Sequence, residues 1–421
     1  MDQTTARIKV HSEEELAALI RSTAQAGRRA RLRGFGSGGS KSGISHTPGQ
    51  LVLLNPSLEP PKLDGDLVTV NSAIRLSELQ DFLRPHNLMI PTVGEWQHPT
   101  VAGSLATGTH GGSAYHGIFS TSLESLRLIT GTGESLLLDS SHPDFKYAAV
   151  SLGLLGITTT VTLRSVPRTQ LQLTTDVVSF DEYRKAPRSQ EGRTRFHASI
   201  WVPGAGKVIR FGADPVADSG RTITREQRFG WRTAIATTLS RKLGWHGLVS
   251  QRFFGRSAAG DAVDILSPIG VSPKVVQTRH VTNLIRGAKA TEFALPADRA
   301  EEALNRLDEL FRTHPASLNN PIGLRMSTGD EFTLSPCQGR DTLWVDLFYG
   351  SSPAFVAALA QVAGELEARC HWGKYLALSG EALKTRYAGW DDFRTACRRM
   401  DPHEVFANEI SDSLGLTGVA S

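Results

Sequence analysis

Two glycine-rich stretches of this sequence have the residue types that hold phosphate groups. The first, RLRGFGSGGSKSGIS, covers residues 31–45, and Gly34, Gly36 and Gly39 within it fit the pattern G-x-G-x-x-G. Successive backbone N–H groups in such a loop can surround an anion, because glycine lets the ligand approach the backbone closely. Taken alone, the pattern fits a phosphate-binding loop or a plain surface turn about equally well.

The residues around this loop do not fit a Rossmann dinucleotide site. That site needs a strand before the glycines and a helix that opens directly after them. A strand is predicted at 28–34, behind an amphipathic helix at 15–26 with a capping box at Ser12 and Glu15. After Gly39, however, comes SKSGISHTPGQ, which is too rich in Ser, Gly and Pro to begin a packed helix, and then a strand, LVLLN. The Rossmann interpretation is therefore rejected.

The second stretch, PTVGEWQHPTVAGSLATGTHGGSAYHG at 91–117, is too long for a turn and has few large side chains to bury. Ordering so much backbone costs conformational entropy, which a large bound ligand would offset. An alternating strand pattern with a turn at Gly131–Gly133 follows, and then SLGLLGITTTVTLRSVP, a glycine-spaced segment that runs into a strand. A ligand wrapped by both glycine-rich stretches is the interpretation that we favour.

Composition narrows the class of protein. The chain has 421 residues, of which 40% are hydrophobic and 21% charged, and its net charge is +4. Two domains are expected at this length, nucleic-acid binding is not indicated, and no apolar run is long enough for a membrane span. The N-terminus lacks the apolar core of a signal peptide, and three sparse cysteines, without metal-ligand spacing, suit a reducing cytoplasm. We therefore expect a cytoplasmic protein.

Several motifs in order make the chain resemble the FAD-binding family of vanillyl-alcohol oxidase and p-cresol methylhydroxylase (PCMH). Within it the sequence is most similar to the branch of alditol and aldonolactone oxidases. The motifs run from residue 31 to 410: RGFGSGGS, TVAGSLATGTHGG, SLGLLGITTTVTL, TEFALP, TLSPCQGRDT, HWGK and RRMDPHEVFANEI. HWGK followed by DP-x-x-x-F-x-N, after two FAD-loop motifs, is the specific part of this pattern.

The resemblance implies an α+β, two-domain flavoprotein. A PCMH-type FAD-binding domain would cover 1–167, and a substrate (cap) domain with an antiparallel sheet and flanking helices would cover 168–375. A C-terminal segment, 376–421, would return to the FAD domain. The implied FAD-binding positions are Arg33, Gly34, Gly36, Ser37, Gly38, Gly39, Ser40, Thr100, Gly103, Ser104, Thr107, Gly108, Thr109, His110, Gly111, Gly112, Ser113, His116, Gly117, Gly156, Ile157, His371, Lys374 and Asn408.

The implied activity is an FAD-dependent oxidoreductase that transfers a hydride from a CH–OH group of a sugar, alditol, lactone or other polyhydroxylated substrate to flavin N5. Oxygen or another electron acceptor would reoxidise the flavin. Two alternatives remain: a tailoring oxidase or redox epimerase on a larger glycosylated or lipid-linked substrate, and a non-catalytic relative that binds a sugar or a partner. The sequence predicts neither the substrate nor the oligomeric state.

One position departs from the family in the first glycine loop. Relatives usually carry G-x-G-H-S there, and the histidine is the covalent attachment point of the flavin. In this chain Gly39 occupies the histidine position and has no side chain to form the bond. We therefore expect FAD to be bound non-covalently.

The resemblance also implies the catalytic residues. Lys374 matches the lysine of HWGK, and Arg325 matches the arginine of a Glu-x-Arg pair beneath the flavin, but Gly323 stands in place of the glutamate. Asp346 falls where relatives often have a histidine. Two fixed positive charges would stabilise an alkoxide or a carbonyl oxygen. Asp346 would accept a proton, as would Lys374 if burial depresses its pKa.

Each of these residues also has a plainer interpretation. The alternatives are an exposed lysine for Lys374, pairing with acids in its own strand and turn for Arg325, and a solvent-facing position for Asp346. His110 in ATGTHGG is more often a structural loop residue, and the alternative for Glu292 in TEFALP is a charge at the approach to the next helix. A basic, aromatic segment at 221–256 suits either a cap helix or, less often, a membrane-surface helix.

Overall fold

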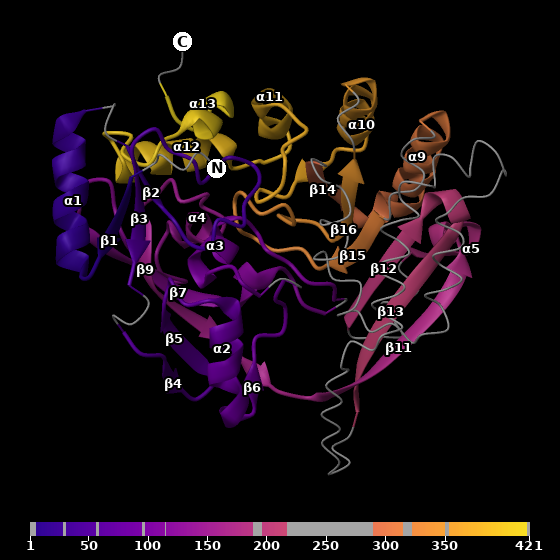
Figure 1. The fold of residues 1–421 in the computed structure, drawn as a ribbon, viewed down its shortest axis with the longest axis horizontal. Helices are drawn as coiled ribbons and strands as arrows, with labels where there is room; N and C mark the ends of the chain where they lie inside the picture. The colour runs from indigo at the N-terminus through magenta and orange to yellow at the C-terminus, as the bar shows by residue number, and fades with distance from the viewer. Residues whose placement is uncertain are drawn as a thin grey trace.

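The computed structural model describes residues 6–27, 31–55, 59–94, 97–113, 115–187, 196–216, 289–314, 322–349 and 353–418. The basic, aromatic segment at 221–256 lies outside this described part of the chain. Helices pack on largely antiparallel sheets, so the predicted α+β class is confirmed (Figure 1). None of the helices within the described ranges is long and apolar enough to cross a membrane.

A small parallel sheet carries the first glycine loop. Its strand order is β1 (Arg7–Val10), β3 (Gln50–Leu54) and β2 (Leu32–Gly34). The predicted helix is α1 (Glu13–Ala26), and its N-cap hydroxyl, Ser12 Oγ, accepts the N–H of Glu15. The strand, the loop and the next strand therefore follow one another as predicted, with no helix between them.

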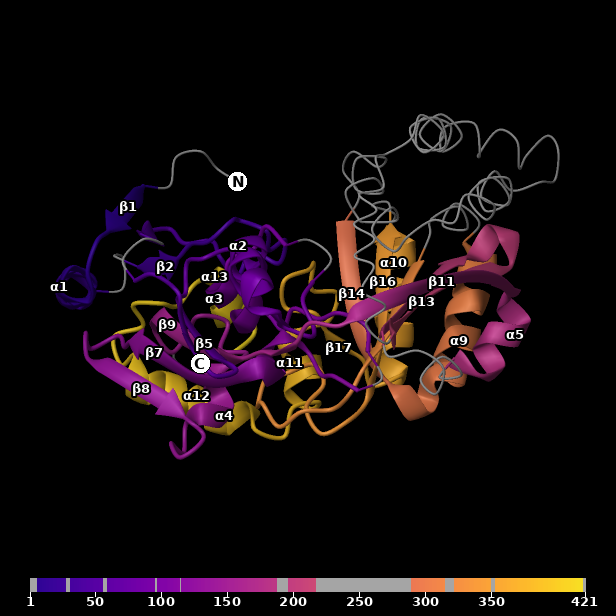
Figure 2. The ribbon, with the colours of Figure 1, turned by 90° about the horizontal axis from the view of Figure 1, so that it is seen from below.

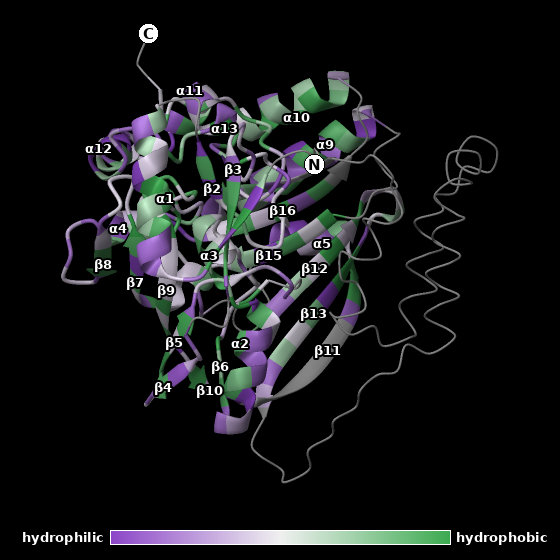
Figure 3. Ribbon diagram, turned by 60° about the vertical axis from the view of Figure 1, so that its left-hand side comes forward, coloured by the Kyte–Doolittle hydropathy of each residue, from purple (hydrophilic) through white to green (hydrophobic). Residues whose placement is uncertain are grey.

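A five-stranded antiparallel sheet lies beneath it, in the order β4 (Lys62–Asp64), β5 (Leu67–Asn71), β9 (Ile157–Arg164), β7 (Leu123–Ile129) and β8 (Ser135–Asp139). Every second side chain of β9 is buried, as the alternation in its sequence ITTTVTLR predicts. Figure 3 shows α1 and α2 banded between hydrophobic and hydrophilic residues, as expected for helices that bury one face. The remaining elements of this part are α2 (Leu76–Leu83), α3 (Val101–Ala106), α4 (Phe145–Ala148) and a two-stranded pair, β6 (Leu88–Met89) with β10 (Val166–Pro167).

The largest sheet has seven antiparallel strands, and the middle of it faces the glycine loops. Helices α5 (Phe180–Lys185), α9 (Ala300–Thr313) and α10 (Pro353–Glu365) lie on its side away from the N-terminal sheets (Figure 2). The strand order is β11 (Gln170–Ser179), β13 (Lys207–Val216), β12 (Phe196–Val202), β15 (Ile322–Ser327), β16 (Thr342–Tyr349), β14 (Lys289–Pro296) and β17 (Arg369–Cys370).

The C-terminal helices α11 (Gly380–Lys384), α12 (Trp390–Met400) and α13 (Glu409–Ser413) lie against the N-terminal sheets (Figure 1). The N–H of Leu32 in β2 donates to Val405 O over 2.8 Å, and the N–H of Gly131 donates to Met400 O over 2.8 Å. The two ends of the chain therefore support the same loops, including the first glycine loop.

Candidate functional site

A cavity of about 580 Å³ lies between the glycine-rich loops and the seven-stranded sheet. Its volume is within the range typical of cofactor and small-molecule sites. One end is lined by backbone of the loops at 33–41, 99–109 and 151–158, and the other by charged side chains of β14, β15, β16 and the HWGK segment. The cavity therefore joins the two kinds of residue that the sequence singled out.

The first glycine loop presents unused backbone donors to this cavity. The N–H of Phe35 donates to Val52 O over 2.8 Å, and the N–H of Lys41 donates to Gly373 O over 2.7 Å. Within the described residues, the five N–H groups between them, at 36–40, donate to no protein acceptor. A Cβ at Gly36 would collide with Thr100 Oγ1, so only glycine fits at this position of the loop. Such a cradle suits the pyrophosphate of FAD.

Arg33 connects the first glycine loop to two other segments of the chain. Its buried guanidinium donates to Gly153 O at 3.0 Å, to Phe406 O at 2.8 Å and to Leu152 O. These carbonyls belong to the glycine-spaced segment before β9 and to the C-terminal segment. Burial lowers the pKa of Arg33 to about 10, which leaves the side chain charged near neutral pH.

Sixteen of the predicted cofactor-binding residues line the cavity. They are Arg33, Gly34, Gly36, Ser37, Gly38, Gly39, Ser40, Thr100, Gly103, Thr107, Thr109, His110, Gly156, Ile157, His371 and Lys374.

The other eight are not among the residues that line the cavity. They are Ser104, Gly108, Gly111, Gly112, Ser113, His116, Gly117 and Asn408. Asn408 caps α13, and its side-chain amide donates to Ile44 O at 2.7 Å and to His46 O at 2.9 Å, so it holds the first glycine loop from behind. Gly112 lies against β12, where a Cβ would collide with His197 O. Direct contact with the cofactor stays a prediction for all eight.

The charged end of the cavity is a row across three neighbouring strands. Asp346 of β16 is paired in register with Gly323 of β15 on one side and with Glu292 of β14 on the other. Two carboxylates directly opposite each other repel, so a cation is needed between them. Lys374 Nζ supplies it, 3.2 Å from Asp346 Oδ2 and 3.7 Å from Glu292 Oε2.

Burial and the shared lysine set the charge of this row. Burial raises the pKa of Asp346, and Glu292 raises it further, against the opposing effect of Lys374. Burial alone would raise the pKa of Glu292, but His110 and Lys374 hold it well below its usual range. Burial alone would depress the pKa of Lys374, but the two carboxylates raise it. Lys374 therefore stays protonated, and the condition under which it would act as a base is not met.

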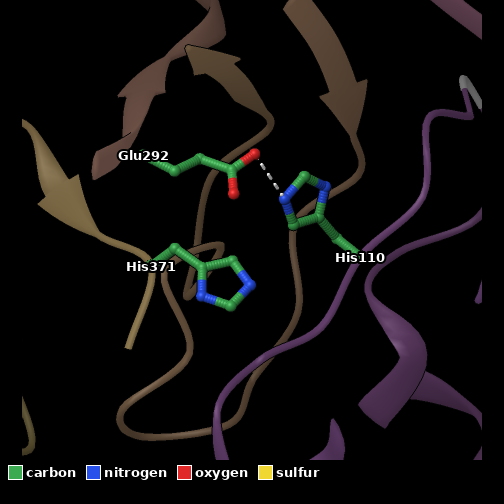
Figure 4. Close-up of side chains that lie close together, drawn as sticks. All are labelled: His110, Glu292 and His371. Carbon is green, nitrogen blue, oxygen red and sulfur yellow. Dashed lines mark hydrogen bonds and ion pairs between the residues drawn. The ribbon is translucent and has the colours of Figure 1, made fainter. Parts of the chain in front are cut away.

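Two buried histidines stand beside Glu292 (Figure 4). His110 Nε2 lies 2.9 Å from Glu292 Oε1, and its Nδ1 lies 2.9 Å from Gly111 O. His371 Nδ1 accepts the N–H of Gly373 over 2.9 Å, so its proton is on Nε2. Burial lowers the pKa of His371 to about 3, and its neutral ring offers an N–H to a ligand in the cavity.

The geometry described so far agrees with comparisons to known proteins. Residues 4–139 match the family described as FAD binding domain, and residues 161–414 match the family described as D-arabinono-1,4-lactone oxidase. The second match covers more than half of the chain. The chain belongs to the D-arabinono-1,4-lactone oxidase family.

Individual proteins similar to this chain carry names that agree with this family. L-gulono-1,4-lactone dehydrogenase of Mycobacterium tuberculosis is 30% identical over 97% of this chain and 95% of its own length. L-gulonolactone oxidase of Bos taurus is 25% identical over 94% and 92%, and alditol oxidase of a Streptomyces species is 27% identical over 85% and 84%. The predicted resemblance is confirmed, and with it an FAD-dependent oxidoreductase acting on CH–OH groups.

Solved structures extend the likeness to the fold. A solvent-stable cholesterol oxidase superposes with a TM-score of 0.76 over 97% of this chain and 94% of that one, at 15% identity. A cholesterol oxidase from B. sterolicum gives a TM-score of 0.73 at 12% identity. At this identity the likeness describes the fold alone, and it agrees with the two-lobed α+β arrangement.

In this member of the D-arabinono-1,4-lactone oxidase family, the plainer interpretations of the charged residues are wrong. Asp346 is buried rather than facing solvent, and Arg325 Nη1 lies 3.7 Å from Glu292 Oε1 on another strand. Lys374 is held in the ion-paired row, with its side chain 24% exposed. Glu292, which the sequence placed at the approach to a helix, is the residue that sequence reasoning missed.

His110, Glu292 and His371 also have the types of a metal-binding trio, since their ligand atoms lie within 4.8 Å of one another. The Glu292 carboxylate is already surrounded by His110, Lys374 and Arg325, and His371 Nδ1 is occupied by a backbone N–H. A further cation would meet two positive side chains here. The arrangement favours protons over a metal ion.

Proposed function

We propose that this chain oxidises a CH–OH group of a sugar-derived 1,4-lactone or a closely related polyhydroxylated compound, with non-covalently bound FAD. The observation that carries the proposal is a single cavity with an anion cradle at one end and Lys374, Arg325 and Asp346 at the other. The positions of these side chains suggest which of them bind the substrate oxygen and which accepts its proton.

The protein's part in the reaction is to bind the substrate oxygen and move its proton. The acceptor for the hydride of the substrate carbon would be supplied by FAD when it is bound. Lys374 and Arg325 are fixed positive charges in a water-poor site, and we assign to them the developing charge on the reacting oxygen. Asp346, whose pKa is raised by burial, is the acceptor for the hydroxyl proton. His371 Nε2–H is a further donor for a substrate oxygen.

A lactone suits this site better than a simple alditol. A carbonyl next to the reacting hydroxyl places two oxygens where two cations can bind them, and the planar arginine fork suits such a pair. The chain also lacks a carboxylate acceptor at Gly323 for the extra hydroxyls of an alditol. Three of the relatives named above act, by their names, on gulonolactone or alditols.

Anaerobic titration of the purified, FAD-loaded protein tests the substrate. L-gulono-1,4-lactone and its stereoisomers are expected to bleach the flavin absorbance at lower concentrations than alditols of the same carbon number. Reoxidation by air or by an added dye then identifies the acceptor. If alditols reduce the flavin as readily as lactones do, the preference for a lactone is wrong. If no compound of either class reduces it, the proposed activity fails.

Acid precipitation tests how FAD is held. Gly39 has no side chain for a covalent link, and Cys337, Cys370 and Cys397 do not line the cavity. We expect yellow colour to be released quantitatively into the acid supernatant. Colour that stays in the pellet would mean that another residue, such as His46 in the same loop, forms the bond.

We also propose functional domains with the boundaries given by the resemblance. An FAD-binding part at 1–167 contains the cradle, a substrate part at 168–375 contains the charged row, and 376–421 supports the cradle from behind. The change from β10 at Val166–Pro167 to β11 at Gln170–Ser179 supports a boundary near residue 168.

A further inference from the structure

Glu292 is the point on which the cationic groups of the site converge. His110 Nε2 lies 2.9 Å from its Oε1, Arg325 Nη1 lies 3.7 Å from the same oxygen, and Lys374 Nζ lies 3.7 Å from Oε2. The carboxylate is 3% exposed. Its backbone also takes part, because Glu292 O accepts the N–H of His371 over 2.9 Å. Three elements far apart in sequence are thus held by one residue.

The hydrogen bonds of His110 determine where its protons are. Gly111 O can only accept, so the ring nitrogen beside it, Nδ1, carries a proton. The other nitrogen, Nε2, faces the Glu292 carboxylate, which Arg325 and Lys374 also face, so positive charges other than His110 favour its ionised form. A carboxylate oxygen also only accepts, so these two partners together would hold His110 as an imidazolium. Its ring stacks on Trp344 with ring centroids 3.7 Å apart and planes 3° from parallel, as a cation over an indole can.

The same carboxylate acts on the row of charges. Asp346 is its partner across the strands, and the two share Lys374. Without the negative charge of Glu292, the ammonium would be free to pair with Asp346 alone. Asp346 would then ionise more easily, and the proton that it is to accept would be held less strongly.

We propose that Glu292 is a positioning residue for the reaction, which keeps His110 as an imidazolium and holds Lys374 between two carboxylates. The inference rests on the roles proposed above for Lys374 and Asp346. Charged or titratable groups that face Glu292 come from every element packed on it: His110 from the second glycine loop, Arg325 from β15, Asp346 from β16, and His371 and Lys374 from the HWGK segment. Removing its charge is expected to change the protonation of His110 and Asp346, whereas removing a residue that only fills space would leave both unchanged.

Glu292→Gln removes the charge and keeps the size of the side chain, and Glu292→Asp keeps the charge. Two measurements on the FAD-loaded full chain distinguish their effects. The first is the nuclear magnetic resonance spectrum of ¹⁵N-labelled histidine, with the His110 signals identified by their absence in His110→Gln. We expect two protonated ring nitrogens at pH 7 in the native protein and in Glu292→Asp, and only one in Glu292→Gln. This measurement needs no substrate, so it stays informative if the proposed activity fails.

The second measurement is the pH dependence of flavin reduction by substrate. In Glu292→Gln the negative charge next to Asp346 is gone, so the pKa of Asp346 should fall. The acid limb is therefore expected to move to lower pH by about one unit. Asp330→Asn is the matched control: its carboxylate is partly buried at the turn after β15, accepts from Ser335 Oγ and Phe332 N, and lies outside the cavity. This variant should leave the profile and the His110 signals unchanged.

The proposal fails if His110 keeps both protons in Glu292→Gln, or if the acid limb stays in place while the rate falls. Should Glu292→Gln lose its fold, as judged by circular dichroism and FAD content, the native protein still decides the first point. A native His110 with only one protonated nitrogen would overturn the assignment.

Discussion

Lys374→Met is expected to lower the rate of flavin reduction by substrate about 10²- to 10³-fold, the loss typical when one donor to a developing oxyanion is removed. Lys374 lies in the cavity between Asp346 and Glu292, and its raised pKa keeps it charged across the neutral range. Methionine has a similar length and no charge, so the change removes the charge while filling most of the space. The measurement is stopped-flow reduction under anaerobic conditions at saturating substrate.

Removing Lys374 also leaves two carboxylates facing each other across the strands, so a loss of rate needs to be separated from a loss of fold. Lys374→Met combined with Asp346→Asn removes one of the two facing negative charges. This double variant should regain thermal stability without regaining activity. Lys384→Met, at a half-exposed lysine that pairs with Asp391 outside the cavity, is the control for a lost charge as such. Unchanged reduction kinetics in Lys374→Met would refute its catalytic role.

Much of the scaffold could be predicted because local patterns determine it. The Ser, Gly and Pro residues after Gly39 were enough to exclude a Rossmann helix, and the loop indeed runs to β3 without one. The alternation in ITTTVTLR and the helical periodicity of α12 predict their elements for the same reason: each pattern reflects one buried face. The order of motifs along the chain then identified the family.

Glu292 could not be found in this way. TEFALP alternates like any strand before a helix, and nothing within it indicates a partner 182 residues earlier. The role of Glu292 depends on the register that pairs it with Asp346 and on the loop that brings His110 over β14. Alternation alone places Glu292 and Ala294 on one face of that strand. Combined with the family position of Asp346 on the neighbouring strand, this would have been the available signal.

The burial of Asp346 could not be predicted from the sequence pattern either. Strands in which one face meets helices and the other meets solvent alternate between apolar and polar residues, so LWVDLFYG was compatible with an aspartate in water. Here the second face meets the glycine loops instead, and Asp346 is buried. Only the packing of the two sheets around the cavity decides between these interpretations.

Asp346→Asn is expected to slow flavin reduction by about 10²- to 10⁴-fold, the range for loss of a general base. Only the ionised carboxylate can accept a proton, and burial together with Glu292 raises its pKa. In the native protein the rate should therefore rise with pH as Asp346 loses its proton. Lys374 needs its proton, and since its pKa is raised as well, no fall of the rate is expected until strongly alkaline pH.

The pH profile separates a base from a residue that only binds Lys374. In Asp346→Asn the residual rate should lose its acid limb, because asparagine does not titrate, while Asp346→Glu should keep a limb at a shifted position. In the native protein Lys374 Nζ lies 3.2 Å from the Asp346 carboxylate. The asparagine amide oxygen can accept a hydrogen bond from the same ammonium, so Lys374 keeps a partner in the variant. An acid limb that stays where it was would assign the base to another group.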